Sequence, residues 1–289
     1  RFRDLAVDEY VFITGWLGEQ IEAYIRAGYT IPAHFVVQQE MLGQSHALWL
    51  AREHLEGPLF VLFVDTLFDE VDFSGLESLD ADGVIFTKRE EDPRRFGVVE
   101  ADADGRALKL IEKPDSMENK NVLIGLYYFK DGAWLARACE TLMERHIQTK
   151  GEYYLADAVT LMIQEGATFY TREVGVWEDT GKPETTLLTH RYLLENGCDN
   201  SIEALHPGVT VIPPVYVHPD ATVERSVIGP YVSIHAGAQV HDSILRDTIV
   251  DEKAELDSVL LENSMVGRWT RVDGHFRELN LGDSSVEIA

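Results

Sequence analysis

The chain has 289 residues, of which 45% are apolar and 26% charged, which suits a globular protein with one large domain or two smaller ones. Its 25 Lys and Arg stand against 50 Asp and Glu, so the formal charge is −25. A surface of that sign repels nucleic acids and anionic membranes, and we expect neither as a partner. Small anionic substrates remain compatible with it, because a bound cation and a few lysines can offset the charge locally.

The cysteines and the longest apolar run bear on the compartment. Cys139 and Cys198 form no disulfide pattern, which favours a reducing compartment. The run PLFVLFV at 58–64 is far too short to span a bilayer, and we see no targeting segment. The sequence therefore predicts a cytoplasmic protein.

Up to about residue 200, buried-type strands alternate with amphipathic helices, which predicts an open α/β sheet. Strands are expected at 10–14, 34–37, 59–64, 84–87, 122–129 and 168–176, and helices at 17–27, 44–54, 131–145, 153–165 and 183–195. The run LFVLFV is apolar on both faces, as is typical of a central strand in a parallel sheet covered by helices. The segment FGVVEADADGRALKLIEK interrupts the alternation and predicts a hairpin around Asp104-Gly105.

After Asn200 the sequence changes to a linker rich in Pro and Gly and then to a repeat of six residues. The repeating apolar positions are Val211, Val217 and Val223, then Ile228, Ile234 and Val240, then Ile244, Val250 and Leu256, then Leu260 and Val266. A period of six favours the hexapeptide repeat of a β-solenoid over ordinary hairpins. At about eighteen residues per coil, the segment holds about three coils. We therefore divide the chain into domains at 1–204 and 205–289.

Two aspartates follow predicted strands. Asp65 comes directly after LFVLFV, and Asp179 comes after the strand that ends in Val176 and Trp177. Ligands of open α/β sheets bind at the carboxyl ends of the strands, and Mg²⁺ needs one or two carboxylates together with substrate phosphates. For each aspartate alone, a strand end or a helix cap is the better interpretation. As a pair at one sheet edge, they favour a Mg²⁺ site.

Two further segments carry candidate binding residues. In IEKP, Lys113 is placed to meet a phosphate as a point charge and Glu112 to accept hydrogen bonds from sugar hydroxyls, although a surface salt bridge is the simpler interpretation of such a pair. In QQEMLGQSHA, Gly43 lets the backbone pass close to a flat base, and the amide of Gln38 can read that base. His46 is interpreted as a residue at the start of a helix, packed near the ligand.

Nearly the whole chain resembles the sugar-phosphate nucleotidyltransferases, specifically the group similar to glucose-1-phosphate thymidylyltransferase with a C-terminal left-handed β-helix. The resemblance rests on an ordered set of segments: GWLGEQIEAYI, QQEMLGQSHA, LFVDTLF, RFGVVEADADGRALKLIEKP, IGLYYF, KGEYYLADAV and VWEDTGKPE. It implies a Rossmann-like α/β mixed sheet followed by a left-handed parallel β-helix. The sequence departs from the family in having Val64-Asp65 where the family has GD, and Lys182 where the family has Thr in GTPE. Neither change removes a metal ligand.

The resemblance also implies an activity and a site. The expected reaction joins an NTP, dTTP in this group, to a sugar 1-phosphate such as glucose 1-phosphate, giving an NDP-sugar and pyrophosphate. By the same resemblance Asp65 and Asp179 hold Mg²⁺, and Asp65, Asp179 and Lys113 are the catalytic residues. Gln38 and Gly43 would contact the base, whereas Gly97, Glu112, Lys113 and Tyr127 would line the sugar-phosphate side. The expected assembly is a homo-oligomer.

The family's opening strand and glycine-rich G-x-G-T-R loop have no counterpart in this sequence. We therefore expect a segment to precede Arg1, and we expect the chain as printed to be inactive. Two alternatives follow. One is a non-catalytic regulatory or assembly subunit on the same fold. The other, ranked lower, is an acyltransferase of the hexapeptide type with His235 or His241 as its base.

Overall fold

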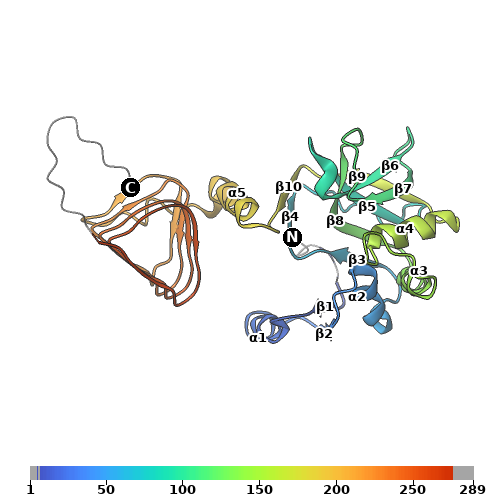
Figure 1. The fold of residues 1–289 in the computed structure, drawn as a ribbon, viewed down its shortest axis with the longest axis horizontal. Helices are drawn as coiled ribbons and strands as arrows, with labels where there is room; N and C mark the ends of the chain where they lie inside the picture. Colours follow the sequence, from blue (N-terminus) through green and yellow to red (C-terminus); the bar gives the residue numbers. More distant parts are fainter. Residues whose placement is uncertain (1–4, 6, 276–289) are drawn as a thin grey trace. The chain divides into compact units, whose positions relative to one another are not determined.

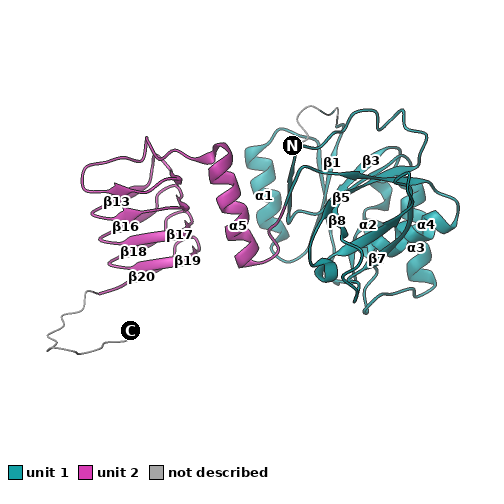
Figure 2. Cartoon of the chain, turned by 90° about the horizontal axis from the view of Figure 1, so that it is seen from above, with its two compact units in different colours: residues 1–177 teal, residues 178–289 magenta. Residues whose placement is uncertain are grey.

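The computed structural model describes residue 5 and residues 7–275, and the chain divides into two compact units, residues 1–177 and 178–289 (Figure 2). Each unit has its own apolar core. Among the described residues, no helix has both the length and the apolar character needed to cross a membrane. The sequence-based boundary at 204/205 stays a prediction.

The first unit is built on a mixed sheet with the strand order β7-β6-β8-β5-β9. These strands are β5 (Gly83–Arg89), β6 (Gly97–Ala101), β7 (Ala107–Glu112), β8 (Asn121–Phe129) and β9 (Phe169–Glu173). Only β5 and β9 pair in parallel, and β6 and β7 form the predicted hairpin. The helices α2 (Gln44–Leu50), α3 (Gly132–Glu144) and α4 (Leu155–Gln164) pack on one another and, through α4, on β7 (Figure 1).

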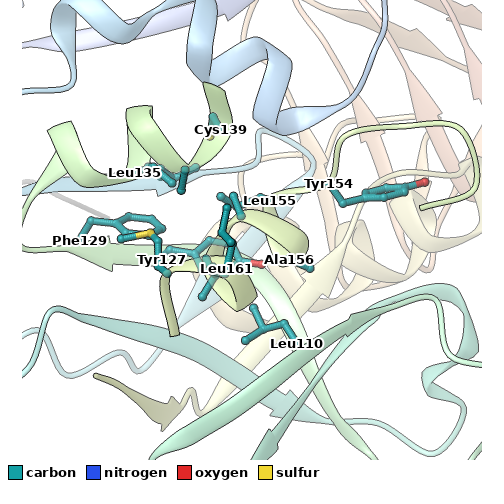
Figure 3. Close-up of a cluster of buried hydrophobic side chains, with 14 of the residues drawn as sticks. Leu110, Tyr127, Phe129, Leu135, Cys139, Tyr154, Leu155, Ala156 and Leu161 are labelled. Atoms are coloured by element: carbon teal, nitrogen blue, oxygen red, sulfur yellow. The ribbon is translucent and has the colours of Figure 1, made fainter. Parts of the chain in front are cut away.

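This unit has two apolar clusters, and the larger one lies between the sheet and these helices. Figure 3 shows Phe129 of β8, Leu135 of α3 and Leu155 of α4 gathered in one cluster, and each is at most 1% exposed. Members of this cluster recur two residues apart on β8, as at Tyr127 and Phe129, and three or four residues apart on α3, as at Leu135, Ala138 and Leu142. Burial of such side chains is the main stabilising contribution to the unit.

The strand predicted at 59–64 is not a central parallel strand. The observed strand β3 (Leu59–Leu62) pairs antiparallel with the second half of β8. Leu62 is 42% exposed and Val64 97% exposed, so the apolar run is not covered on both faces. An apolar run indicates potential for burial but does not determine which neighbours pair with the strand.

A separate two-stranded parallel sheet lies at the start of the unit. It consists of β1 (Tyr10–Thr14) and β2 (Ala33–Val37), connected by α1 (Gly18–Gly28). The register pairs Tyr10 with Ala33 and Thr14 with Val37, so both strands end at the same edge. That edge leads directly into Gln38.

The strand predicted at 168–176 is divided in two. β9 ends at Glu173, and β10 (Val176–Asp179) pairs with β4 (Thr66–Asp69), a strand that the sequence pattern did not reveal. The break falls at Gly175, where a Cβ atom would collide with the side chain of Glu70. Short 3-10 turns, η1 (Arg52–His54) and η2 (Pro93–Arg95), complete the unit.

The second unit begins with α5 (Pro183–Leu193) and the turn η3 (Leu194–Cys198) and continues as a parallel β-solenoid. Its strands are β11 (Thr210–Val211), β12 (Val215–Val217), β13 (Thr222–Glu224), β14 (Val227–Ile228), β15 (Val232–Ile234), β16 (Gln239–His241), β17 (Ile244–Val250), β18 (Glu255–Asp257), β19 (Leu260–Val266) and β20 (Arg271–Asp273). Seen nearly end-on in Figure 1, the coils form a triangle. The predicted fold class, a mixed sheet followed by a left-handed parallel β-helix, is confirmed.

The solenoid has about four turns rather than three. Thr222 pairs with Gln239, 17 residues later, and Gln239 pairs with Glu255, 16 residues later, so a coil is shorter than the expected eighteen. The corners use left-handed backbone, as at Asp242 and Ser258, with φ near 50°. Such corners turn the chain sharply within a single residue.

Two of the predicted inward positions are wrong. Ile244 and Leu260 are 48% and 77% exposed, whereas the next residue, Leu245, is fully buried. Leu245 stacks on Ile228 in the register of the coils. Adjacent apolar residues cannot be told apart by spacing, and in a strand a shift of one residue moves a side chain to the opposite face.

Candidate active site

Four of the predicted site residues come together on the sheet of the first unit. The hairpin register places Gly97 opposite Glu112, and Lys113 follows directly. A Cβ atom on Gly97 would lie 2.9 Å from Glu112 Oε2 and 2.6 Å from Leu123 Cδ1. The glycine therefore lets the Glu112 carboxylate lie against the backbone of β6.

Glu112 is a partly desolvated carboxylate. Burial raises its pKa above the ordinary value, and the neighbouring charges of Asp157 and Glu152 add to this, whereas Lys113 opposes it. Desolvation strengthens each hydrogen bond that the carboxylate accepts. A carboxylate in this setting is suited to hold hydroxyl groups of a bound sugar.

Lys113 occupies a constrained position at the end of β7. Its φ is 46°, and its Nζ donates a hydrogen bond to the hydroxyl of Tyr154 at 3.0 Å. This hydrogen bond raises the pKa of Lys113, so the ammonium stays charged. The carbonyl of Lys113 accepts a hydrogen bond from Lys150 Nζ at 3.0 Å, which brings a second ammonium to the same corner. An ammonium group at this corner suits a phosphate as a point charge.

Tyr127 lies deeper than the other three. It is 3% exposed, its ring is 6.2 Å from that of Phe63 and 6.2 Å from that of Phe129. Burial raises the pKa of Tyr127, and the charge of Glu112 raises it further. Tyr127 is therefore a buried residue near Glu112. Its contact with a sugar phosphate stays a prediction.

The segment from Gln38 to His46 forms a tight loop at the edge where β1 and β2 end. Gln38 Nε2 lies 3.1 Å from the carbonyl oxygen of Gly43 and 2.9 Å from Nδ1 of His46. Both amide hydrogens of Gln38 therefore have partners within the loop, and its Oε1 is the atom suited to accept from a base. His46 orients Gln38, in agreement with its interpretation as a packing residue.

Gly43 has a structural reason to be glycine. Its φ of 106° and ψ of 174° belong to a region that only glycine adopts readily. A Cβ atom here would lie 2.5 Å from the carbonyl oxygen of Tyr153 and 2.8 Å from its nitrogen. The backbone does approach closely at Gly43, but the group approached is Tyr153. Contact of Gly43 with a base stays a prediction.

The segment Tyr153-Tyr154 connects the two predicted groups of residues, and it was not identified from the sequence. Gly43 and Ser45 pack on it, and Ser45 Oγ donates to the carbonyl oxygen of Tyr154 at 2.9 Å. On its other side, the Tyr154 hydroxyl holds Lys113. The available signal was the segment KGEYYLADAV, which contains both Lys150 and the two tyrosines.

The two aspartates belong to different units. Asp65 is exposed and follows β3 in the first unit, whereas Asp179 ends β10 in the second. Asp179 Oδ1 accepts a hydrogen bond from the backbone N–H of Gly181 at 2.9 Å, which fixes the orientation of the carboxylate. Carboxylate oxygens are the ligands that Mg²⁺ prefers, so the donor chemistry fits. A metal site shared by both aspartates stays a prediction.

The histidines of the acyltransferase alternative lie on the solenoid. His241 Nδ1 is 3.7 Å from Glu224 Oε2, and the ring of His235 is 6.2 Å from that of Tyr216. These contacts support a pairing role for His241, with Glu224, and a packing role for His235, against Tyr216. They do not favour this alternative.

The profile of the nucleotidyl transferase family matches residues 4–196. A bifunctional protein GlmU of Methanococcus vannielii is 27% identical over 90% of this chain and 64% of its own length. A glucose-1-phosphate thymidylyltransferase of Streptomyces antibioticus is 28% identical over 88% of this chain and 78% of its own length. A low-salt glycan biosynthesis nucleotidyltransferase, Agl11, of Haloferax volcanii is 29% identical over 67% of this chain and 55% of its own length.

The chain thus spans between about half and two thirds of the length of two of these relatives. Among solved structures, a nucleoside-diphosphate-sugar pyrophosphorylase from Vibrio cholerae superposes with a TM-score of 0.54 at 17% identity. The alignment covers 63% of this chain and 80% of that protein. A putative glucose-1-phosphate thymidylyltransferase from Bacillus anthracis gives a TM-score of 0.52 at 18% identity over 63% of this chain and 74% of its own. At 17% and 18% identity, the similarity to these two structures shows the fold alone.

Proposed function

Because the chain belongs to the nucleotidyl transferase family, we propose that the protein transfers a nucleotidyl group from an NTP to a sugar 1-phosphate. The products are an NDP-sugar and pyrophosphate. The observation that supports this most strongly is the corner at Lys113, where the charges of Lys113 and Lys150 act on the partly buried carboxylate of Glu112 and lower its pKa against the effect of burial. Such a corner is suited to a ligand that carries both a phosphate and hydroxyl groups.

In the proposed reaction, a phosphate oxygen of the sugar 1-phosphate attacks the α-phosphorus of the NTP. The bond from the α-phosphorus to the bridging oxygen of the β-phosphate breaks in line, and pyrophosphate leaves. Lys113 holds the attacking phosphate, and Glu112 fixes the sugar through its hydroxyls. The reaction needs no nucleophilic side chain, because catalysis of this kind depends on position and charge.

We propose dTTP and glucose 1-phosphate as the substrates. The names of the relatives differ in substrate, and the name of the Streptomyces antibioticus protein includes both of these substrates. The geometry of Gln38 supports a base with an N–H donor, because the amide hydrogens of Gln38 are used by Gly43 and His46. Thymine offers such a donor at N3, and each of the other bases offers one on a ring or exocyclic nitrogen, so this geometry is compatible with dTTP without selecting it.

We propose that Asp65 and Asp179 together hold Mg²⁺. When bound, the ion would neutralise charge on the phosphates during transfer. The hydrogen bond from Gly181 to Asp179 keeps one carboxylate in place before any ligand arrives. Asp65 is exposed and accessible to a cation.

Assembly and location extend the proposal. Ile244 and Leu260 form an outward apolar stack on the solenoid, and a second copy of the chain would cover it, which supports a homo-oligomer. Sedimentation or light scattering of the variant with both residues changed to Ser should then give a smaller assembly.

We place the protein in the cytoplasm because Cys139 and Cys198 are both free thiols.

The test is a substrate panel with the full-length protein, in which four NTPs are combined with several sugar 1-phosphates. We expect pyrophosphate and NDP-sugar in equal amounts, with dTTP and glucose 1-phosphate among the best pairs. Turnover with a different pair would retain the activity and reject only these substrates. If no pair reacts and the protein instead alters the rate of another nucleotidyltransferase, the non-catalytic alternative is correct.

A further inference from the structure

Two histidines and a glutamate converge at the edge opposite Gln38. His34 Nε2 lies 3.0 Å from Glu9 Oε2, and His54 Nδ1 lies 3.8 Å from Glu9 Oε1. The two imidazole rings are 4.5 Å apart between centroids. One donor atom from each of the three residues lies within 4.8 Å of the other two. From this juxtaposition we propose that Glu9, His34 and His54 bind one Zn²⁺ ion.

The donor set and the spacing both match zinc. Two imidazole nitrogens and one carboxylate oxygen, with water in the fourth position, form a known tetrahedral zinc set. With bonds of about 2.0–2.1 Å, tetrahedral donors lie about 3.3 Å apart. His34 Nε2 lies 3.0 Å from Oε2 of Glu9 and His54 Nδ1 lies 3.8 Å from Oε1 of Glu9, on either side of that value. Small rotations of exposed side chains suffice to close the site.

The local surroundings leave the cluster open to a cation. The side chains of Glu9 and His34 are 41% and 47% exposed, and that of His54 is 28% exposed. Arg52, two residues before His54, lies over the ring of Trp49, with its guanidinium carbon 4.4 Å from the centroid. Its guanidinium is held by Trp49 and by the Trp49 carbonyl at 3.1 Å.

The ligands come from three segments that are distant in the sequence. Glu9 precedes β1, His34 lies in β2, and His54 ends η1 after α2. The strands β1 and β2 form a two-stranded sheet of their own, whereas Leu48 of α2 and Leu55 belong to the main core. A two-stranded sheet is marginally stable by itself. The zinc ion would tie it to the body of the unit.

The position assigns the ion a structural role. His34 and Gln38 are four residues apart along an extended segment, which is about 13 Å. At that distance the ion does not reach Gln38. The readout of the proposal is therefore metal binding and stability, independent of turnover and of the proposed reaction.

The experiment is calorimetric titration of the untagged, chelator-treated full-length protein with ZnCl₂, together with Co²⁺ absorption in the visible range. We expect one Zn²⁺ per chain at this site and the bands of four- or five-coordinate Co²⁺. In His34→Ala, His54→Ala and Glu9→Gln the affinity should fall on the order of a hundredfold or more, since even indirect partners of a metal contribute ten- to a hundredfold. At a hundredfold excess over Kd, Zn²⁺ should raise the Tm of the wild type by about 5 °C or more.

The matched control is His218→Ala, because His218 also faces a carboxylate, Asp220, at 3.8 Å but forms only a pair. It should bind Zn²⁺ as the wild type does. Far-UV circular dichroism checks that each variant is folded. If His34→Ala is not folded, His34→Gln is used in its place. If the wild type does not bind Zn²⁺ stoichiometrically, the proposal is overturned, and the contact between His34 and Glu9 is an ion pair only. Equal affinity in the wild type and all three ligand variants would overturn it as well.

Discussion

Replacing Gly43 with alanine tests the packing that holds the candidate site together. Gly43 has φ 106° and ψ 174°, and an added Cβ would lie 2.5 Å from the carbonyl oxygen of Tyr153. Tyr153 cannot retreat freely. Its N–H donates to the carbonyl of Leu42 at 2.8 Å, and its carbonyl accepts from the N–H of Ser45 at 2.9 Å.

The expected cost combines three contributions: the backbone strain, the entropy of the unfolded chain and the overlap with Tyr153. Holding a non-glycine residue in this backbone region costs about 1–3 kcal/mol. Restricting the unfolded chain returns about 0.4–1 kcal/mol. The overlap with Tyr153 adds to the cost, so we expect Gly43→Ala to lower the free energy of unfolding of the first unit by about 2–3 kcal/mol.

Urea denaturation followed by tryptophan fluorescence measures this, since Trp49 lies on the neighbouring helix α2. Gly28→Ala is the matched control, because nothing lies within 4 Å of an added Cβ there. Its midpoint should equal that of the wild type or exceed it slightly. If Gly43→Ala unfolds at the same urea concentration as the wild type, or if both variants lose the same stability, neither the positive φ nor the close approach to Tyr153 requires glycine at position 43.

Two further predictions concern charge. Lys113→Met should raise the KM for sugar 1-phosphate by about ten- to a hundredfold, the equivalent of a charge-assisted hydrogen bond of about 1.5–3 kcal/mol, with a smaller effect on the NTP. A larger rise in the KM for NTP would place Lys113 on the other side of the site. Burial lowers the pKa of His190 to about 4, so the second unit should be fully stable above pH 6.5, the ordinary pKa of histidine, and lose stability as pH falls from there to 4. The shift corresponds to at most about 3 kcal/mol, which screening by solvent reduces to about 1–2 kcal/mol. Urea midpoints at pH 7 and pH 5 measure it, and an unchanged pH slope in His190→Leu would contradict the assignment.

The sequence predicted the elements better than their pairing. The hairpin around Asp104-Gly105 was correct because its turn and the alternation of its strands are both local signals. The placement of β3 was wrong because pairing partners are chosen by the whole sheet, which an apolar run does not encode. The solenoid was recognised by its period, but Ile244 was placed inward in error because Leu245 beside it is equally apolar.

Within the candidate site, the predicted residues fall into two sets that the sequence could not connect. Lys113 and Gly43 are 70 positions apart, and what joins them is the segment Tyr153-Tyr154, which carries no chemistry that stands out in the sequence. The need for glycine at position 43 was foreseen, the close neighbour found there is Tyr153, and the expected contact with a base stays a prediction. A glycine in a sequence can indicate that the backbone there lies close to another group. The sequence does not say which group that is, and only the fold identifies it.

The central claim, nucleotidyl transfer assisted by a metal at Asp65 and Asp179, is tested most directly by one rate measurement. The full-length protein, Asp65→Asn and Asp179→Asn are compared for pyrophosphate release in the presence of Mg²⁺ and the best substrate pair. We predict turnover by the wild type and a loss on the order of a thousandfold or more in each variant, with the fold intact by circular dichroism. Turnover near that of the wild type in either variant would contradict the claim.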